Sequence, residues 1–146
     1  LEHGVANPRL MVTGPVKFVA RAQLRQVIAN IIGNAIDAMR RGGRLRIRIS
    51  SVRDRDGLPR TRLTLADSGS GIPATLLPTI FEPFITTKGE TGTGLGLWVT
   101  SEIVRRNGWT IRVRSRCGPG GTGTVFSIAM PVTLASEQIQ REAAVA

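Results

Sequence analysis

The longest periodic run of apolar residues lies between residues 24 and 39. Apolar side chains recur there at three- and four-residue spacing, which places them on one face of an α-helix. These positions are Leu24, Val27, Ile28, Ile31, Ile32, Ala35, Ile36 and Met39. We predict a helix that begins near Arg21 and ends before Gly42 and Gly43, since glycine commonly follows the last helical turn.

Asn30 and Asn34 lie one turn apart on a flank of this apolar face. Asparagine is a poor helix former that prefers caps and turns. The pair therefore indicates either a polar cleft beside the core or two exposed surface amides.

Four stretches alternate between apolar and polar residues with the period of two that is typical of β-strands. They cover residues 44–52, 60–66, 109–116 and 123–130. Arginine occupies the polar positions in residues 44–49 and 111–114, as expected for a sheet with one face in water. The last two strands form a hairpin with an extended glycine-rich turn.

Weaker patterns complete the organisation of the chain. We predict an irregular segment over residues 1–15, a short strand over 16–20, a short helix over 73–77, a long loop over 78–93, a second helix over 98–107 and a tail or linker over 132–146. Because 146 residues suit a single core, we expect one domain over residues 16–131.

Three glycines, Gly92, Gly94 and Gly96, stand at alternate positions immediately before the second predicted helix. Each would cost about 1 kcal/mol relative to alanine inside a helix, so helix stability does not explain them. The first N–H groups of a helix lack partners and the helix dipole is positive there, which suits a phosphate chain. The pattern indicates a phosphate site, or else a flexible loop that happens to precede a helix.

Composition narrows the class of protein. Cys117 is the only cysteine, so no internal disulfide forms and we expect a reducing, cytoplasmic compartment. No apolar run approaches the roughly 18 to 20 residues that cross a bilayer, so we expect no insertion into a membrane. The net charge of +10 raises nucleic acid as a partner, but the alternating arginines and the 4% aromatic content argue against it.

Four motifs in a fixed order resemble the N, G1, F and G2 boxes of the catalytic ATP-binding domain of sensor histidine kinases. They are Asn30 to Ala35, Asp67 to Gly71, Phe81 to Lys88, and Gly92 to Leu97. This domain is a branch of the Bergerat-fold (GHKL) ATPases. The resemblance implies an α/β two-layer (α+β) sandwich. It would have a mixed, mostly antiparallel sheet of about five strands, three main helices on one face and an ATP lid.

The resemblance also implies ATP and Mg²⁺ as ligands. Asn34 and Asn30 would hold the metal, and Asp67 would accept a hydrogen bond from the adenine amino group. Asn30 would act in catalysis together with Lys88, which would reach the γ-phosphate from the lid. The other implied nucleotide-binding residues are Gly69, Gly71, Ile72, Gly92, Thr93, Gly94, Leu95, Gly96, Leu97 and Thr124.

The residue type at Asn30 bears on the reaction. ATP-hydrolysing relatives of this fold, such as DNA gyrase, carry a glutamate there that activates water as a general base. An amide has no comparable basicity. The resemblance thus implies transfer of the γ-phosphate to a histidine on a separate dimerisation and phosphoacceptor domain of a bacterial two-component kinase, with the receiver domain of a response regulator as a further partner.

The phosphoacceptor segment of such kinases is not recognisable in this sequence, and His3 is the only histidine. We therefore expect the isolated chain not to phosphorylate itself. Two alternatives remain: a serine or threonine kinase of the same fold, of the anti-sigma type, and a pseudo-kinase that binds nucleotide only to regulate a partner.

Overall fold

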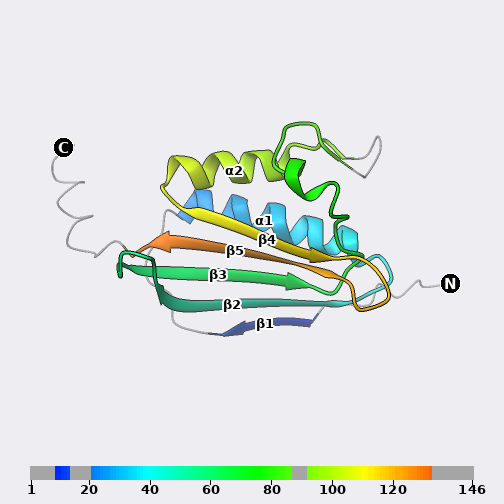
Figure 1. The fold of residues 1–146 in the computed structure, drawn as a ribbon, viewed down its shortest axis with the longest axis horizontal. Helices are drawn as coiled ribbons and strands as arrows, with labels where there is room; N and C mark the ends of the chain where they lie inside the picture. The colour runs from blue at the N-terminus through cyan, green and yellow to red at the C-terminus, as the bar shows by residue number, and fades with distance from the viewer. Residues whose placement is uncertain (1–8, 14–20, 87–91, 133–146) are drawn as a thin grey trace.

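Two α-helices lie on one face of a five-stranded sheet in the computed structural model, which describes residues 9–13, 21–86 and 92–132 (Figure 1). The helices are α1 (Arg21–Ala38) and α2 (Gly96–Arg106), with a short 3-10 helix, η1 (Leu77–Thr79), between them in sequence. The strands are β1 (Arg9–Thr13), β2 (Arg44–Arg53), β3 (Pro59–Asp67), β4 (Thr110–Arg116) and β5 (Gly123–Pro131).

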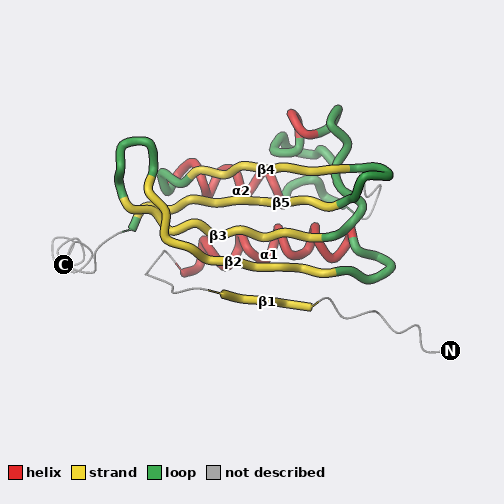
Figure 2. The backbone as a smooth tube through the Cα atoms, turned by 60° about the horizontal axis from the view of Figure 1, so that its bottom comes forward, coloured by secondary structure: helices red, strands yellow, loops and turns green. Residues whose placement is uncertain are grey.

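The strand order is β1-β2-β3-β5-β4. All neighbours are antiparallel except β1, which runs parallel to β2. Figure 2 looks onto the sheet with both helices behind it, so no described helix covers the near face. The architecture is therefore a two-layer α+β sandwich with one open sheet face.

The core lies between the helices and the inner face of the sheet. Val27, Ile31 and Ala35 of α1 are 0–3% exposed and pack against apolar side chains of the central strands. The partners from β2, β3 and β5 are Leu45, Ile47, Leu63, Leu65, Phe126, Ile128 and Met130. The predicted apolar face of α1 is confirmed except at Ile36, which is 51% exposed.

Three expectations about the elements are wrong. Residues 9–13 belong to an assumed irregular segment, yet they form β1, because backbone pairing with β2 supplies hydrogen bonds that no local pattern reveals. In place of a helix over residues 73–77 the chain forms a turn followed by η1. The described residues thus contain two main helices rather than three. The strand predicted over residues 16–20 lies outside the described residues.

The predicted strands from residue 44 onward and both long helices are confirmed, with ends that shift by one or two residues. Neither described helix is long and apolar enough to cross a membrane.

The two faces of β5 allow a matched test of the core. Ile128 is fully buried, whereas Val125 on the other face is 37% exposed. We expect Ile128→Ala to lower the free energy of unfolding by about 2 to 5 kcal/mol through lost burial and a cavity. Val125→Ala should cost less than about 1 kcal/mol. Urea unfolding of both variants checks this, and equal losses would contradict the assignment of the two faces.

Candidate nucleotide-binding site

A cleft of about 920 Å³ opens beside α1, where the turn after β3, the segment before α2 and the start of β5 meet. Of the predicted nucleotide-binding residues within the described chain, only Leu95 does not line it. Those that do are Asn30, Asn34, Asp67, Gly69, Gly71, Ile72, Gly92, Thr93, Gly94, Gly96, Leu97 and Thr124. Lys88 lies outside the described residues, so its expected contact with phosphate stays a prediction.

Asp67, the last residue of β3, joins three segments at one end of the cleft. Its Oδ1 accepts hydrogen bonds from the backbone N–H of Gly69 at 2.8 Å and of Thr124 at 3.2 Å. Burial raises the pKa of the Asp67 carboxyl, and the two N–H donors oppose that rise. Since both donors meet Oδ1, the second oxygen remains an acceptor for a ligand in the cleft.

Close backbone contacts require the two glycines that follow Asp67. A Cβ at Gly69 would lie 2.6 Å from the Cβ of Ala38, at the end of α1. Gly71 has a φ of +76°, and a Cβ there would strike the backbone carbonyl oxygen of Arg116. Packing within the protein itself therefore accounts for both glycines, independent of any ligand.

Ser115 is a residue at this end of the cleft that the sequence analysis missed. Its Oγ accepts a hydrogen bond from the backbone N–H of Ile72 at 2.7 Å and lies 2.8 Å from the Oγ1 of Thr124, which is 3% exposed. It also lies 3.0 Å from the carbonyl oxygen of Gly123, to which it can donate. The sequence signal that could have identified Ser115 is its place in the alternating pattern: it occupies an inward position of a strand whose other inward residues are apolar.

The segment that leads into α2 also lines the cleft. Gly94 has a φ of +65°, and a Cβ there would lie 2.6 Å from the carbonyl carbon of Phe84. Gly96 is different, because a Cβ at this position would be 3.7 Å from the nearest side-chain atoms of Asn30, an ordinary contact. No described protein atom requires a glycine at position 96. Leu95 immediately precedes the first residue of α2 and does not line the cleft.

Asn30 ties α1 to the start of α2. Its Nδ2 donates to the carbonyl oxygen of Gly96 at 2.9 Å and to the Oγ1 of fully buried Thr100 at 3.3 Å. A carbonyl oxygen can only accept, so the amide nitrogen must be the atom turned toward α2. The amide oxygen is then the atom of Asn30 that can meet a ligand or cation.

Acidic groups do not form a conventional metal cage here. Within the described ranges, no group of three or more His, Cys, Asp or Glu residues could hold a metal ion. The oxygen donors that line the cleft near Asn30 include Asn34 and the carboxylate of Asp37. This donor set fits a hard cation such as Mg²⁺, which usually keeps several waters and shares its remaining sites with phosphate oxygens. Arg40 and Arg41 also line the cleft and were not predicted.

Comparison with known proteins identifies the family to which the chain belongs. The family of histidine kinase-, DNA gyrase B- and HSP90-like ATPases matches residues 20–134. Sensor histidine kinase ZraS of Escherichia coli (strain K12) is 39% identical over 118 residues, which are 81% of this chain and 23% of ZraS. The chain thus spans less than a quarter of that relative.

Two solved structures share the fold. The catalytic domain of histidine kinase ThkA has a TM-score of 0.65 at 33% identity, over 79% of this chain and 70% of that one. Full-length ShkA in complex with AMPPNP has a TM-score of 0.72 at 28% identity, over 90% of this chain and 26% of that one. The chain belongs to the histidine kinase-, DNA gyrase B- and HSP90-like ATPase family, and it is a catalytic domain of the sensor histidine kinase type.

The raised pKa of Asp67 predicts how stability depends on pH. A carboxyl whose pKa is higher in the folded state contributes stability below its unfolded pKa, near pH 4, and loses it as pH rises through the folded value. Asp67→Asn keeps an oxygen for both N–H donors and removes the charge. We expect this variant to gain stability relative to wild type as pH rises from about 3 to 7.

Asp54 provides the opposite control. Backbone hydrogen bonding from Leu58, with help from Arg60, lowers the pKa of this carboxyl. Its stabilising contribution is present above the unfolded pKa and disappears as pH falls. Asp54→Asn should therefore lose stability relative to wild type over the same rise in pH. Urea unfolding at several pH values would contradict the assignment if both variants followed the same trend.

Ser115→Ala tests whether this hydroxyl positions the cleft. The change leaves the backbone N–H of Ile72 without its partner, at an expected cost of about 1 to 3 kcal/mol. Nucleotide affinity should fall as well, because the turn that carries Gly71 and Ile72 loses its anchor on β4. Ser127→Ala, on the outer sheet face, is the control and should change neither property. Unfolding and calorimetric titration with ATP measure both, and a Ser115→Ala loss confined to stability would exclude the positioning role.

Proposed function

We propose that the chain binds Mg-ATP in this cleft and transfers the γ-phosphate to a histidine on a separate phosphoacceptor domain, which then passes it to a response-regulator receiver domain. The observation that carries the proposal is Asn30. Membership in the ATPase family supports nucleotide binding in the cleft. At the position where ATP-hydrolysing relatives carry a glutamate as general base, this chain has the amide of Asn30.

Asp67 supports the choice of ATP over GTP. Its second carboxylate oxygen can accept a hydrogen bond from the adenine amino group. Guanine has a carbonyl oxygen at that position, so two acceptors would face each other. An unmade buried hydrogen bond costs about 1 to 3 kcal/mol, which is enough for marked discrimination.

The start of α2 supports the placement of the phosphates. Backbone N–H groups at a helix N-terminus and the positive end of the dipole favour an anion. Gly96 lines the cleft and has no packing reason to be glycine, so a closely approaching phosphate accounts for the missing side chain. The complex of the fold relative ShkA with AMPPNP is consistent with a nucleotide in this type of cleft.

Asn30 and Asn34 would hold Mg²⁺ through their amide oxygens, together with phosphate oxygens and water. When bound, the metal neutralises charge on the phosphates. The Asn30 amide cannot take a proton from water, so hydrolysis should be slow. Transfer then depends on an incoming imidazole nitrogen, which forms a P–N bond as the bond from the γ-phosphorus to the bridging oxygen breaks and ADP leaves.

Calorimetric titration tests the nucleotide site. Wild type should bind ATP more tightly than GTP, and Mg²⁺ should strengthen binding. Asp67→Asn presents an amide donor instead of an acceptor, so ATP affinity should fall by roughly tenfold or more while GTP loses little. Asn34→Ala should abolish the effect of Mg²⁺. Asp56→Asn, in the β2–β3 turn and outside the cleft, is the control; unchanged ATP affinity in Asp67→Asn would refute the adenine assignment.

Radiolabelled ATP tests the transfer. The chain alone should incorporate no γ-phosphate, but it should label an added helical domain that carries a phosphoacceptor histidine. Phosphohistidine is labile to acid and stable to base, whereas phosphoserine is stable to acid. An acid-stable product would establish the serine or threonine kinase instead. Tight ATP binding with no transfer to the histidine domain would favour a regulatory nucleotide-binding protein.

A further inference from the structure

The open face of the sheet carries arginines in a regular arrangement. In one cross-strand row, Arg46 of β2 and Arg114 of β4 flank small or medium side chains on the two strands between them, β3 and β5. In the next row, Arg48 and Arg112 hold the same places. The intervening residues are Ala66 and Val125 in the first row and Thr64 and Ser127 in the second.

A third pair extends the pattern. Arg44 begins β2 and Arg116 ends β4, where it lies opposite Gly123. At the other end, Arg62 of β3 lies opposite Ser50 and Ala129 and closes the row of small residues. The three arginines along β2 and the three along β4 form two walls. We call these walls, together with the small residues between them, the arginine trough. Its walls are Arg44, Arg46, Arg48, Arg112, Arg114 and Arg116.

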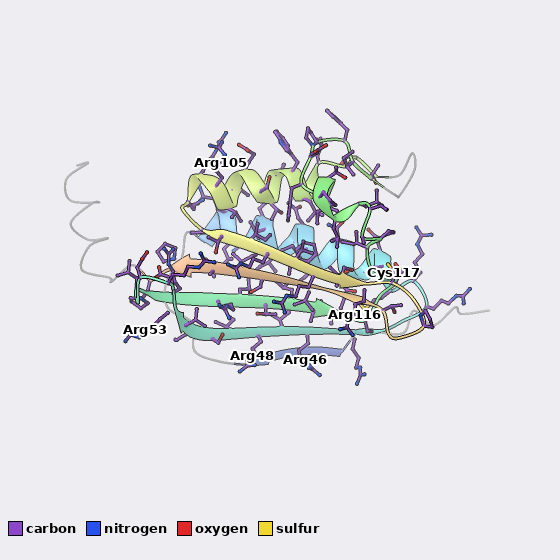
Figure 3. All side chains as sticks on the ribbon, in the orientation of Figure 1. Arg46, Arg48, Arg53, Arg105, Arg116 and Cys117 are labelled. Carbon is purple, nitrogen blue, oxygen red and sulfur yellow. The ribbon has the colours of Figure 1, made fainter. Side chains whose placement is uncertain are left out.

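No acidic side chain in the described part of the chain forms an ion pair with these walls. All six arginines are exposed, and the ion pairs formed between described residues involve only Arg60, Arg105 and Arg106 among the basic residues. Figure 3 shows Arg46 and Arg48 projecting from the sheet away from the helices, while Arg105 lies on α2 at the opposite side. The trough therefore concentrates unpaired positive charge on one surface.

The dimensions of the trough limit what can occupy it. Three strand spacings separate β2 from β4, about 14 Å, and each wall runs about 13 Å along its strand. An α-helix with its side chains is about 10 to 12 Å wide and covers 13 Å with roughly nine residues. Small side chains would face the floor of the trough, and carboxylates on both flanks of the helix would reach the arginines, which favour bidentate contacts with carboxylates.

Other anionic partners fit this surface less well. The trough has no aromatic side chain on which the bases of a single-stranded nucleic acid could stack. Its largest apolar side chain is Val125, 37% exposed, so it offers no large apolar group to insert into a bilayer.

We propose that the arginine trough docks an acidic α-helix of a protein partner, with glutamate or aspartate along both of its flanks. None of the six wall arginines lines the nucleotide cleft, so this surface is separate from the catalytic site and does not depend on the proposed function. Charge complementarity would also speed the encounter and make it sensitive to salt.

A synthetic helix provides the probe. It is a fluorescent peptide of about two heptads with alanine at positions a and d and glutamate at e and g. A second peptide has the same composition with its glutamates grouped at one end, and a third has glutamine in place of glutamate. We expect the first to bind at least about fivefold more tightly than the second and the third not to bind measurably at low salt. Equal binding of the first two peptides would overturn the trough geometry.

Two variants of equal charge locate the binding surface. One replaces Arg46, Arg48, Arg112 and Arg114 with serine; the other replaces Arg25, Arg55, Arg105 and Arg106, which are exposed and lie off this face. The first should weaken peptide binding at least about tenfold and the second less than about threefold. ATP affinity and circular dichroism confirm that both remain folded. Similar losses of affinity in the two variants would mean that binding depends only on the net charge of the protein, which would overturn the proposal.

A charge reversal tests the same surface if the serine variant is unstable. Arg48→Glu with Arg112→Glu should lose the glutamate peptide and bind a peptide with lysine at the e and g positions. Failure of that exchange would argue against docking between the two walls. Duplex DNA and vesicles containing phosphatidylserine serve as competitors. If either displaced the glutamate peptide and itself lost affinity specifically in the first variant, the surface would be a nucleic-acid or membrane site instead.

Discussion

The packing of α1 against one face of the sheet is the constraint on which the rest of the structure depends. Val27, Ile31 and Ala35 are almost completely buried, so the helix cannot rotate about its axis without exposing them. This fixes Asn30 and Asn34 on the flank that borders the cleft. Asn30 then binds the N-terminal half of α2 through Gly96 and Thr100. A hydrophobic contact thereby determines where a polar group meets the N-terminus of a second helix.

The cleft combines features that the fold needs with features that weaken it. Gly69, Gly71 and Gly94 are required by close contacts with other parts of the backbone. Gly96 has no such reason, and burial of Asp67 raises the pKa of its carboxyl, so the ionised form is held at a cost to stability. Gly96 has no packing reason to be glycine, and the hydrogen bonds to Asp67 need only an oxygen atom rather than a charge; both residues line the cleft where a ligand would bind. Gly96 and Asp67 therefore say more about function than the other three glycines do.

Much of this arrangement could be predicted from the sequence, because α1 and the four antiparallel strands have strong periodic patterns. β1 could not, since its five residues are stabilised by parallel pairing with β2, a contact distant in sequence. Asp67 and the glycines were found because their residue types are unusual in their local context. Ser115 was missed because a serine in a strand is ordinary, and its role depends on Ile72 and Thr124, which only the folded chain brings together. The register also could not be predicted, although the alternation of arginine and apolar residues was clear.

That register changes the meaning of the high net charge. The counts alone, 20 basic residues against 10 acidic ones, indicate only an affinity for polyanions in general. In the folded sheet, the alternation that buries Leu45 and Ile47 necessarily turns Arg46 and Arg48 outward, and pairing through β3 and β5 sets them opposite Arg114 and Arg112. Exposed arginines are not needed for the strand pattern, because any polar residue would serve. Their repetition on β2 and β4 in successive rows, with small residues on the two strands between them, therefore favours recognition of a shaped anionic partner over a merely solvated surface.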